Sequence, residues 1–181
     1  MRHSISFVGI SLLLISCTLM SCSAQRTRDE VVTMGTLNLT SPAFEHMEEI
    51  PAKYTCQGDD INPPLKIGGI PGNAASLVLI VDDPDAPMGT WNHWVMWNIP
   101  LISSIPEDSV PAEAVQGLNS WPKNKYGGPC PPSGTHRYFF KLYALDTKLT
   151  LGNGSGKKDV AQAMQGHIIS QATLIGLYKK K

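Results

Sequence analysis

The distribution of apolar and polar residues predicts four strands. Ser76–Val81 is the most apolar run after the N-terminal segment and predicts a strand. His93–Ile99 is largely apolar on both faces and is stopped by Pro100, so it should lie centrally in a sheet, covered on both sides. Arg137–Leu145, rich in Tyr and Phe, predicts a third clear strand, and the alternating stretch Thr36–Thr40 predicts an opening strand.

The period of the pattern changes near the C-terminus. Val160, Met164 and Ile168 recur every four residues, which predicts an amphipathic helix over Lys157–Gln171. Thr173–Tyr178 then either continues this helix or forms a final strand.

Two polar or proline-rich stretches separate these elements. Asp82–Pro87 holds three carboxylates and two prolines. Proline removes a donor from the sheet ladder and ionised side chains resist burial, so the strand from Ser76 should end here in a fixed, polar turn. Residues 101–135 contain six prolines and predict a long loop. Loops of that length inside a compact domain are often functional.

Composition supports a strand-based fold and excludes some functions. The 181 residues include 14 prolines and 16 glycines, which favours a loop-rich fold over a helical bundle. Residues 34–181 suffice for a single domain with a real core. Fifteen basic and fifteen acidic residues cancel, so nothing indicates a nucleic-acid partner. The sequence has no phosphate-binding loop, zinc motif or nucleophile elbow, and we expect no cofactor and no metal.

The N-terminus is interpreted as a targeting segment. A basic start and the apolar run Ile5–Met20, short for a membrane span, suit a signal peptide. Residues 1–22 resemble a bacterial lipoprotein signal, with Cys22 as the lipidated residue and residues 23–33 as a tether. Cys17 fits a similar pattern, but cleavage before Cys22 leaves an even number of other cysteines. An ordinary secretory signal is the alternative. We therefore expect an exported protein, anchored by lipid in the bacterial cell envelope.

Export makes a disulfide between Cys56 and Cys130 plausible. Both lie in loop-like contexts, and two separate thiols remain the competing interpretation. Metal ligation is less favoured because no clustered His/Cys spacing appears.

Several residues with ionisable or hydrogen-bonding side chains should lie close together at one end of the sheet. His136 and Tyr138 are two apart on one strand and therefore share a face. If the first two buried strands pair antiparallel, Asp83 and His93 fall at the same end. A carboxylate beside an imidazole fixes its tautomer and raises its proton affinity. Donor rings, a phenol and loop amides suit a small anion, particularly a phosphoryl group, with the carboxylates orienting the donors.

Three motifs in this order resemble the phosphatidylethanolamine-binding proteins, in the bacterial branch described as Raf kinase inhibitor-like. They are Asp83–Pro87, His93–Pro100, and Gly128–Gly134 followed by His136-Arg137-Tyr138. The resemblance implies a mainly β fold, with antiparallel, Greek-key-like sheets and a few peripheral helices, and an anion pocket at one end. Carried over by position, that pocket would include the following residues: Asp83, Asp85, Pro87, His93, Gly128, Cys130, His136 and Tyr138.

Individually, each of these residues also has a structural interpretation. The Asp-Pro-Asp stretch could be only a rigid turn, and the histidines could be structural. Arg137 should face away from the pocket and pair with a carboxylate elsewhere. The tryptophans at 91, 94 and 97, and His167, are expected to serve packing.

Two functions follow from these expectations. The first is a binding protein for a small phosphoryl-containing anion or phospholipid headgroup, attached to the membrane by its N-terminal lipid. The alternative is a modulator or inhibitor of another protein, such as a protease, kinase or host factor, acting through the pocket rim. Catalysis is not expected, because no evident nucleophile accompanies the predicted Asp–His pair.

Overall fold

The computed structural model describes Met1 and residues 36–181. The predicted signal segment, the tether and Cys22 lie outside the described residues. None of the helices in the described part is long and apolar enough to cross a membrane.

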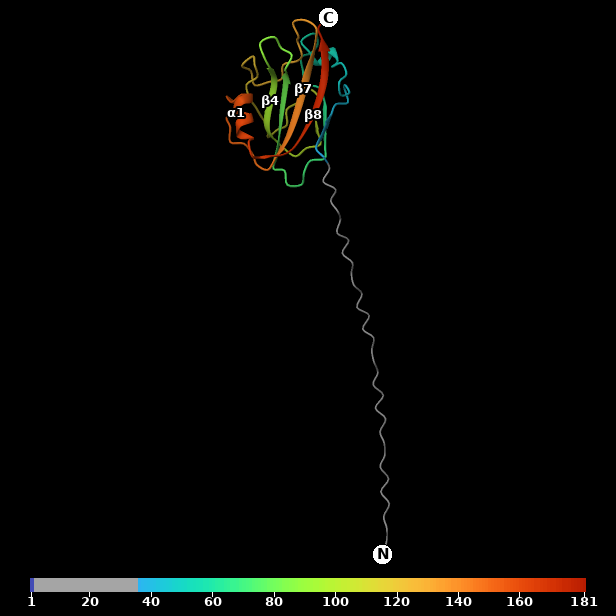
Figure 1. The fold of residues 1–181 in the computed structure, drawn as a ribbon, viewed down its shortest axis with the longest axis vertical. Coiled ribbons are helices and arrows are strands. Elements are labelled where there is room, and N and C mark those ends of the chain that lie inside the picture. Colours follow the sequence, from blue (N-terminus) through green and yellow to red (C-terminus); the bar gives the residue numbers. More distant parts are fainter. Residues whose placement is uncertain (2–35) are drawn as a thin grey trace. The chain divides into compact units, whose positions relative to one another are not determined.

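Two antiparallel sheets make up the fold (Figure 1). The larger has the order β6-β4-β3-β7-β8, and the smaller has the order β1-β2-β5. The strands, the 3-10 helix and the α-helix follow in chain order: β1 Asn38–Thr40, η1 Ala52–Tyr54, β2 Leu65–Gly68, β3 Ser76–Asp83, β4 Trp91–Ile99, β5 Ser104–Ile105, β6 Val115–Gln116, β7 Thr135–Leu145, α1 Lys157–Ala163 and β8 Ile168–Lys179. The mainly β, antiparallel fold class is therefore confirmed.

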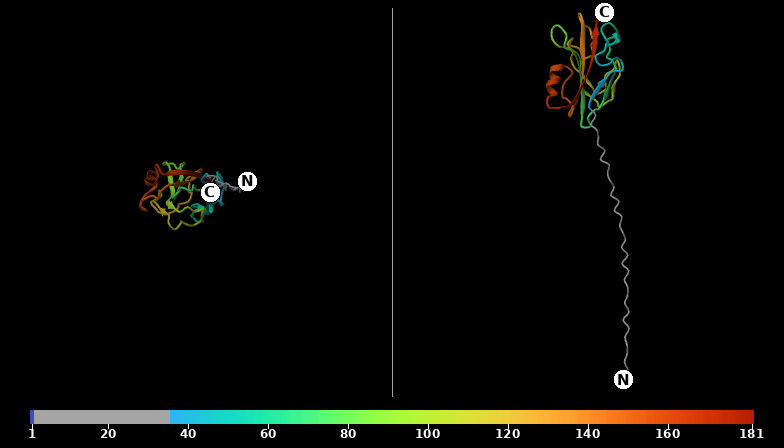
Figure 2. Two further views of the ribbon diagram at one scale, coloured as in Figure 1. Left: turned by 90° about the horizontal axis from the view of Figure 1, so that it is seen from below. Right: turned by 45° about the vertical axis from the view of Figure 1, so that its right-hand side comes forward.

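Both faces of the larger sheet are covered. In β3, Leu77 and Leu79 point to a core shared with the small sheet, while Val78 and Ile80 point to a second core under α1. Figure 2 shows the small sheet and α1 on opposite sides of the large sheet. Alternation of side chains between faces explains why β3 and β4 read as nearly continuous apolar runs. The sequence predicted that β4 is covered on both sides, and its side chains do lie in both cores. The strand at the centre of the large sheet, however, is β3 and not β4.

The prediction that the sheet ends before Asp82 is wrong. Strand β3 continues through Asp82 and Asp83, and both are buried. Asp82 is 0% exposed but lies 3.0 Å from the Lys141 Nζ and also pairs with Lys157 at the start of α1. A buried carboxylate is tolerated when it is paired, and these partners come from distant parts of the chain.

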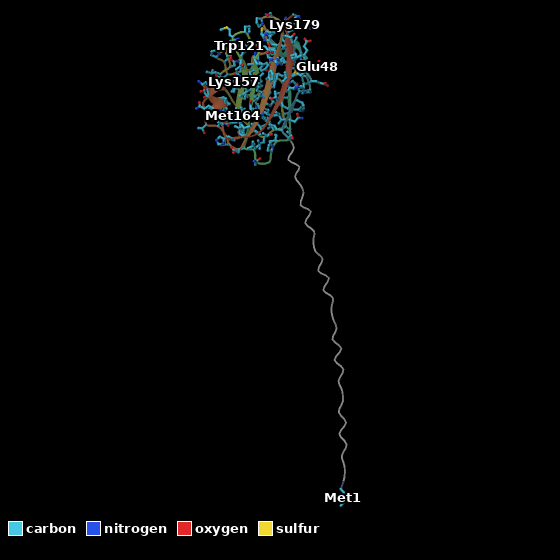
Figure 3. The ribbon with its side chains drawn as sticks, viewed as in Figure 1. Met1, Glu48, Trp121, Lys157, Met164 and Lys179 are labelled. Carbon is cyan, nitrogen blue, oxygen red and sulfur yellow. A yellow bond between two sulfur atoms is a disulfide. The ribbon has the colours of Figure 1, made fainter. Side chains whose placement is uncertain are left out.

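The predicted helix over Lys157–Gln171 is also too long. The α-helix ends at Ala163, and Ile168 already belongs to β8. Val160 and Met164 do pack on the large sheet, and Figure 3 shows Lys157 and Met164 at the two ends of this helical segment. Gly166, at φ +80°, then reverses the chain, and β8 pairs with β7 along its length. Tertiary pairing thus overrides the local four-residue period.

The remaining segments agree broadly with the prediction. Residues 101–134 form a long connection in which the named strands are the two-residue β5 and β6, and β7 begins at Thr135. Of the two alternatives for Thr173–Tyr178, a continued helix or a final strand, the structure has the strand, as part of β8. The disulfide between Cys56 and Cys130 is present, with the Cα atoms 5.4 Å apart. It joins the turn after η1 to the loop before β7.

Candidate functional site

A cavity of about 280 Å³ lies where β3 ends, β4 begins and β7 begins. Strands β3 and β4 pair antiparallel, with Asp83 opposite Trp91, so the end of one strand meets the start of the next. The cavity is lined by Asp83, Ala86, Pro87, Met88, Trp91, His93, Trp121, Cys130, Pro132 and Tyr138.

Asp83 orients His136 rather than His93. The Asp83 Oδ2 lies 2.7 Å from the His136 Nδ1, and both side chains are almost fully buried. A carboxylate accepts, so the His136 Nδ1 donates its hydrogen. The other oxygen, Oδ1, accepts the Asp85 backbone N–H at 2.8 Å. Asp83 is therefore held from two sides at the base of the turn.

His93 is bonded to a loop carbonyl. Its Nδ1 lies 2.7 Å from the Gly127 carbonyl oxygen, and the Gly127 N–H donates to the His93 carbonyl at 3.1 Å. Because a carbonyl only accepts, Nδ1 must carry the hydrogen, and the neutral ring has its lone pair on Nε2. Burial lowers the pKa of His93, against the opposing effects of the Gly127 carbonyl and Asp83. The neutral ring therefore has its acceptor at Nε2, on a side chain that lines the cavity.

Two side chains lining the cavity have buried donors without acceptors in the described part of the chain. They are the Tyr138 hydroxyl and the Trp91 Nε1–H. Burial raises the pKa of Tyr138 far above its ordinary value, and Asp83 raises it further, so the phenol stays protonated. A buried donor without a partner costs about 1–3 kcal/mol. The indole N–H of the core residue Trp97 lacks an acceptor too, so Tyr138 and Trp91 are candidates for ligand contact because both also line this cavity.

Asp85 is engaged on the outer side of the turn. Its Oδ2 accepts both the Arg137 backbone N–H and the Arg137 Nε–H at 2.9 Å, and its Oδ1 accepts from Nη2 at 2.7 Å. The guanidinium bonds lower the pKa of Asp85 to about 2. The expectation that Arg137 pairs with a carboxylate is met, and its partner is a residue assigned to the pocket by resemblance.

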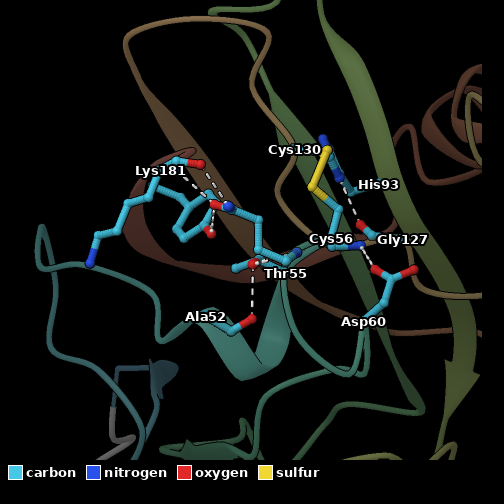
Figure 4. Close-up of a disulfide and its surroundings, with 11 residues drawn as sticks. Ala52, Thr55, Cys56, Asp60, His93, Gly127, Cys130 and Lys181 are labelled. Atoms are coloured by element: carbon cyan, nitrogen blue, oxygen red, sulfur yellow. Dashed lines mark hydrogen bonds between the residues drawn. A yellow bond between two sulfur atoms is a disulfide. The ribbon is translucent and has the colours of Figure 1, made fainter.

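The loop 127–132 forms one wall of the site and is tied down by the disulfide. Figure 4 shows Cys130 beside His93 and Gly127, with Cys56 bonded to it. The Gly128 N–H donates to the Asp60 Oδ1 at 2.6 Å. Gly128 cannot carry a side chain here, since a Cβ would lie 2.6 Å from the Tyr54 carbonyl oxygen.

Of the eight residues expected in the pocket, five line this cavity: Asp83, Pro87, His93, Cys130 and Tyr138. His136 stands behind Asp83, Asp85 faces Arg137, and Gly128 lines an adjoining cavity. Trp94 and Trp97 are core residues, as expected, but Trp91 lines the cavity. His167 pairs with Asp146 at the surface rather than packing.

Sequence reasoning missed Trp91, Trp121, Met88, Ala86 and Pro132 as cavity residues. Trp91 and Trp121 make an edge-on contact, with ring centroids 5.2 Å apart, and the Trp121 ring stands edge-on to His93 at the same distance. For Trp121 and Pro132 the available signal was the proline-rich composition of residues 101–135, which marked a long loop with functional potential.

The cavity contains one carboxylate and no lysine or arginine. An anion could be held only by neutral donors or by protonated His93. Among the described residues, no cluster of three or more His, Cys, Asp or Glu side chains could hold a metal ion.

The chain is similar in sequence to a known protein family and to curated relatives. The family model described as phosphatidylethanolamine-binding protein matches residues 40–179. A UPF0098 protein of Methanothermobacter thermautotrophicus is 52% identical over 150 residues, covering 80% of this chain and 99% of the relative. A UPF0098 protein of Pyrococcus horikoshii is also 52% identical over 150 residues, covering 78% of this chain and 76% of the relative.

Two solved structures share the fold. One is a phosphatidylethanolamine-binding protein homologue from Chlamydia trachomatis, 45% identical, with a TM-score of 0.78, covering 81% of this chain and 99% of that one. The other is YbcL of E. coli, described as a new member of the mammalian phosphatidylethanolamine-binding protein family. It is 30% identical with a TM-score of 0.76, and the match covers 81% of this chain and 100% of that one.

Proposed function

The chain belongs to the phosphatidylethanolamine-binding protein family, and from that premise we propose that it binds a small phosphoryl-containing anion, free or as a phospholipid headgroup, in the cavity between Asp83, His93 and Tyr138. The family is one of binding proteins, and the bound group is the finer part of the proposal.

One observation carries this proposal. The Tyr138 hydroxyl and the Trp91 Nε1–H are both buried, both belong to residues lining one cavity, and neither has an acceptor in residues 36–181. A phosphoryl group supplies several acceptor oxygens at once, and hydrogen bonds to an anion are stronger than neutral ones. The apolar walls, including Pro87 and Pro132, suit the organic part of such a ligand.

Asp83 supports the anion indirectly. Its carboxylate would repel a phosphoryl group at close range, but it accepts from His136 and from the backbone of Asp85. Both hydrogen bonds offset its charge and leave it as a positioning residue. The carboxylates therefore do not orient the donors that line the cavity: Asp83 pairs with His136 behind it, and His93 is oriented by the Gly127 carbonyl.

A titration tests the proposal. Addition of phosphate, phosphoethanolamine or a short-chain phospholipid should shift the ring resonances of His93 and His136, while those of exposed His167 serve as the internal control. If the two buried rings stay unmoved at millimolar concentrations of all three probes, the anion site is refuted. Comparing phosphate with the short-chain phospholipid separates a free anion from a headgroup.

We also propose that the protein is exported and anchored by lipid at Cys22. The disulfide in the described part of the chain supports export, because disulfides persist in oxidising compartments. Palmitate labelling in bacteria should be lost in Cys22→Ala and kept in Cys17→Ala. The reverse pattern would transfer the anchor to Cys17, and no label in the wild type would refute anchoring.

A second candidate, action on another protein through the pocket rim, is favoured by one observation. Met88 is 94% exposed and Trp121 38% exposed, and both border the cavity. Large apolar side chains exposed at a cavity mouth are typical of contact surfaces. A photo-crosslinker at position 88 should yield one defined protein adduct in native cells, which excess short-chain phospholipid suppresses. Absence of any discrete adduct refutes this candidate.

A further inference from the structure

A second cavity, of about 230 Å³, adjoins the proposed anion site. Trp121 and Cys130 line both cavities and so form their shared wall. The second cavity is lined by Lys123 and Lys125, whereas the first has no lysine or arginine. The two cavities therefore differ in character: one offers neutral donors and apolar walls, and the other offers formal positive charge.

The segment that carries the lysines is held by a buried side chain. The Asn119 Oδ1 accepts the backbone N–H of Trp121 at 2.9 Å and of Lys123 at 3.1 Å. Its Nδ2 donates to the Lys125 carbonyl at 2.9 Å. Asn119 is 6% exposed, so these bonds are shielded from water and fix the turn. The lysine stems thus start from a defined backbone.

The shared wall is also fixed. Trp121 packs so closely on Gly127 that a Cβ there would lie 2.6 Å from the ring. Its ring meets Trp91 and His93 edge-on, each with centroids 5.2 Å apart. Cys130 is held by its bond to Cys56. A ligand reaching from one cavity to the other would therefore pass over the exposed part of Trp121.

The second cavity has a net positive charge. Within residues 36–181, Lys123 and Lys125 form no ion pair. The cavity has one carboxylate, Asp60, and its Oδ1 already accepts the Gly128 N–H. Lys125 also borders a hollow lined by the carboxylates of Asp59, Asp60 and Asp108, so Lys123 is the less compensated of the two cations.

We propose that the second cavity is a subsite for a second anionic group of the same ligand. The ligand class is then a small molecule with two anionic groups: a phosphoryl group beside His93 and Tyr138, and a further phosphoryl or carboxylate group at Lys123 and Lys125. The linker between them crosses Trp121. This inference rests on the proposed function, because it assigns the first group to the anion site.

Matched ligands of graded length test the subsite. The probes are alkane-1,n-diol bisphosphates with linkers of about three to eight carbons, each compared with the alkyl monophosphate of the same length. At one optimal length the bisphosphate should bind about tenfold more tightly than its monophosphate, the gain of two partly exposed charge contacts. This gain should shrink at high salt, because the lysines are exposed.

Variants assign the gain to the lysines. The double variant Lys123→Gln/Lys125→Gln should abolish the difference between bisphosphate and monophosphate and leave monophosphate affinity unchanged. The charge-matched control Lys66→Gln/Lys158→Gln, on β2 and α1, should keep the difference. Equal binding of both ligand types at every length, or a gain that survives loss of Lys123 and Lys125, overturns the subsite alone. If no monophosphate binds the wild type, the proposed function fails with it.

Discussion

Proton uptake at His93 should accompany anion binding. The Gly127 carbonyl fixes the hydrogen on Nδ1, so the neutral ring can offer only a lone pair on Nε2. An anion and a lone pair repel, and the ring becomes a donor only when Nε2 is protonated. Burial holds the pKa of free His93 below its ordinary value of 6.5, so near neutral pH the proton must be taken up on binding. The bound anion raises the pKa of this ring.

The magnitude follows from linkage. Where the complex holds one more proton than the free partners, affinity falls about tenfold for each pH unit above the pKa of free His93. Between about pH 6.5 and about pH 8.5 the dissociation constant should therefore rise up to about 100-fold, or about 2.7 kcal/mol. The dependence levels off above the pKa of the bound ring.

The assay uses a phosphodiester such as dimethyl phosphate, which keeps a single negative charge over this range. Any proton uptake then belongs to the protein. Calorimetric titration in buffers of different ionisation enthalpy should report close to one proton taken up at neutral pH.

His93→Gln places an amide donor near the Nε2 position and should bind with a nearly flat pH profile. His93→Asn keeps a donor for Gly127 but none for the cavity, and should bind weakly at every pH. His167→Gln, at the surface, should behave as the wild type. A wild-type affinity that does not change with pH, or a His93→Gln variant with the wild-type slope, would refute the reasoning.

Three further predictions concern the same end of the sheet. Tyr138→Phe should weaken phosphate binding about tenfold or more, the value of a hydrogen bond to an anion, with no loss of thermal stability because the removed hydroxyl has no acceptor in residues 36–181; unchanged affinity in a calorimetric titration would exclude the phenol from the site. Reduction of the Cys56–Cys130 disulfide, which spans 74 residues, should lower the free energy of unfolding by about 4 kcal/mol. Denaturant unfolding with and without reductant measures this, and a loss below about 1 kcal/mol would contradict the chain-entropy argument. In the folded protein the pKa of Asp85 is lowered to about 2, so the stability that Asp85 contributes is present above its unfolded pKa near 3.8 and is lost as the pH falls toward 2. Asp85→Asn should therefore lower the free energy of unfolding at pH 7 by about 1 kcal/mol, discounted for solvent screening, and make this free energy depend less on pH between about 4 and 2. Identical pH dependence of unfolding in wild type and variant would disprove the contribution of the Arg137 pair.

The strands were predictable from sequence because their patterns are strong. Ser76–Val81 and His93–Ile99 are apolar on both faces, and only a strand covered on both sides makes use of such a pattern. The boundaries were less predictable. Asp82 lies in the sheet because two lysines far away in sequence neutralise it, and no local pattern shows that.

The site was predictable in its members but not in its pairing. Asp83, His93 and Tyr138 could be placed at one end of the sheet from strand alternation and direction. Which imidazole the carboxylate meets depends on register: His136 sits on β7, which also pairs with β3, and it takes Asp83, while His93 turns to Gly127.

By itself, the sequence determined that Ser76–Val81, His93–Ile99 and Arg137–Leu145 form strands and that a turn follows at Pro84 and Pro87. Those properties depend on side-chain period and on backbone restrictions that act within a few residues. The tertiary structure alone decided the tautomer of His93, the donors left without acceptors at Trp91 and Tyr138, and the lysine-lined cavity beyond Trp121. Each of these depends on contacts between residues distant in the chain, and the residues 101–135 that complete the site have too little regular structure for a local pattern to position them.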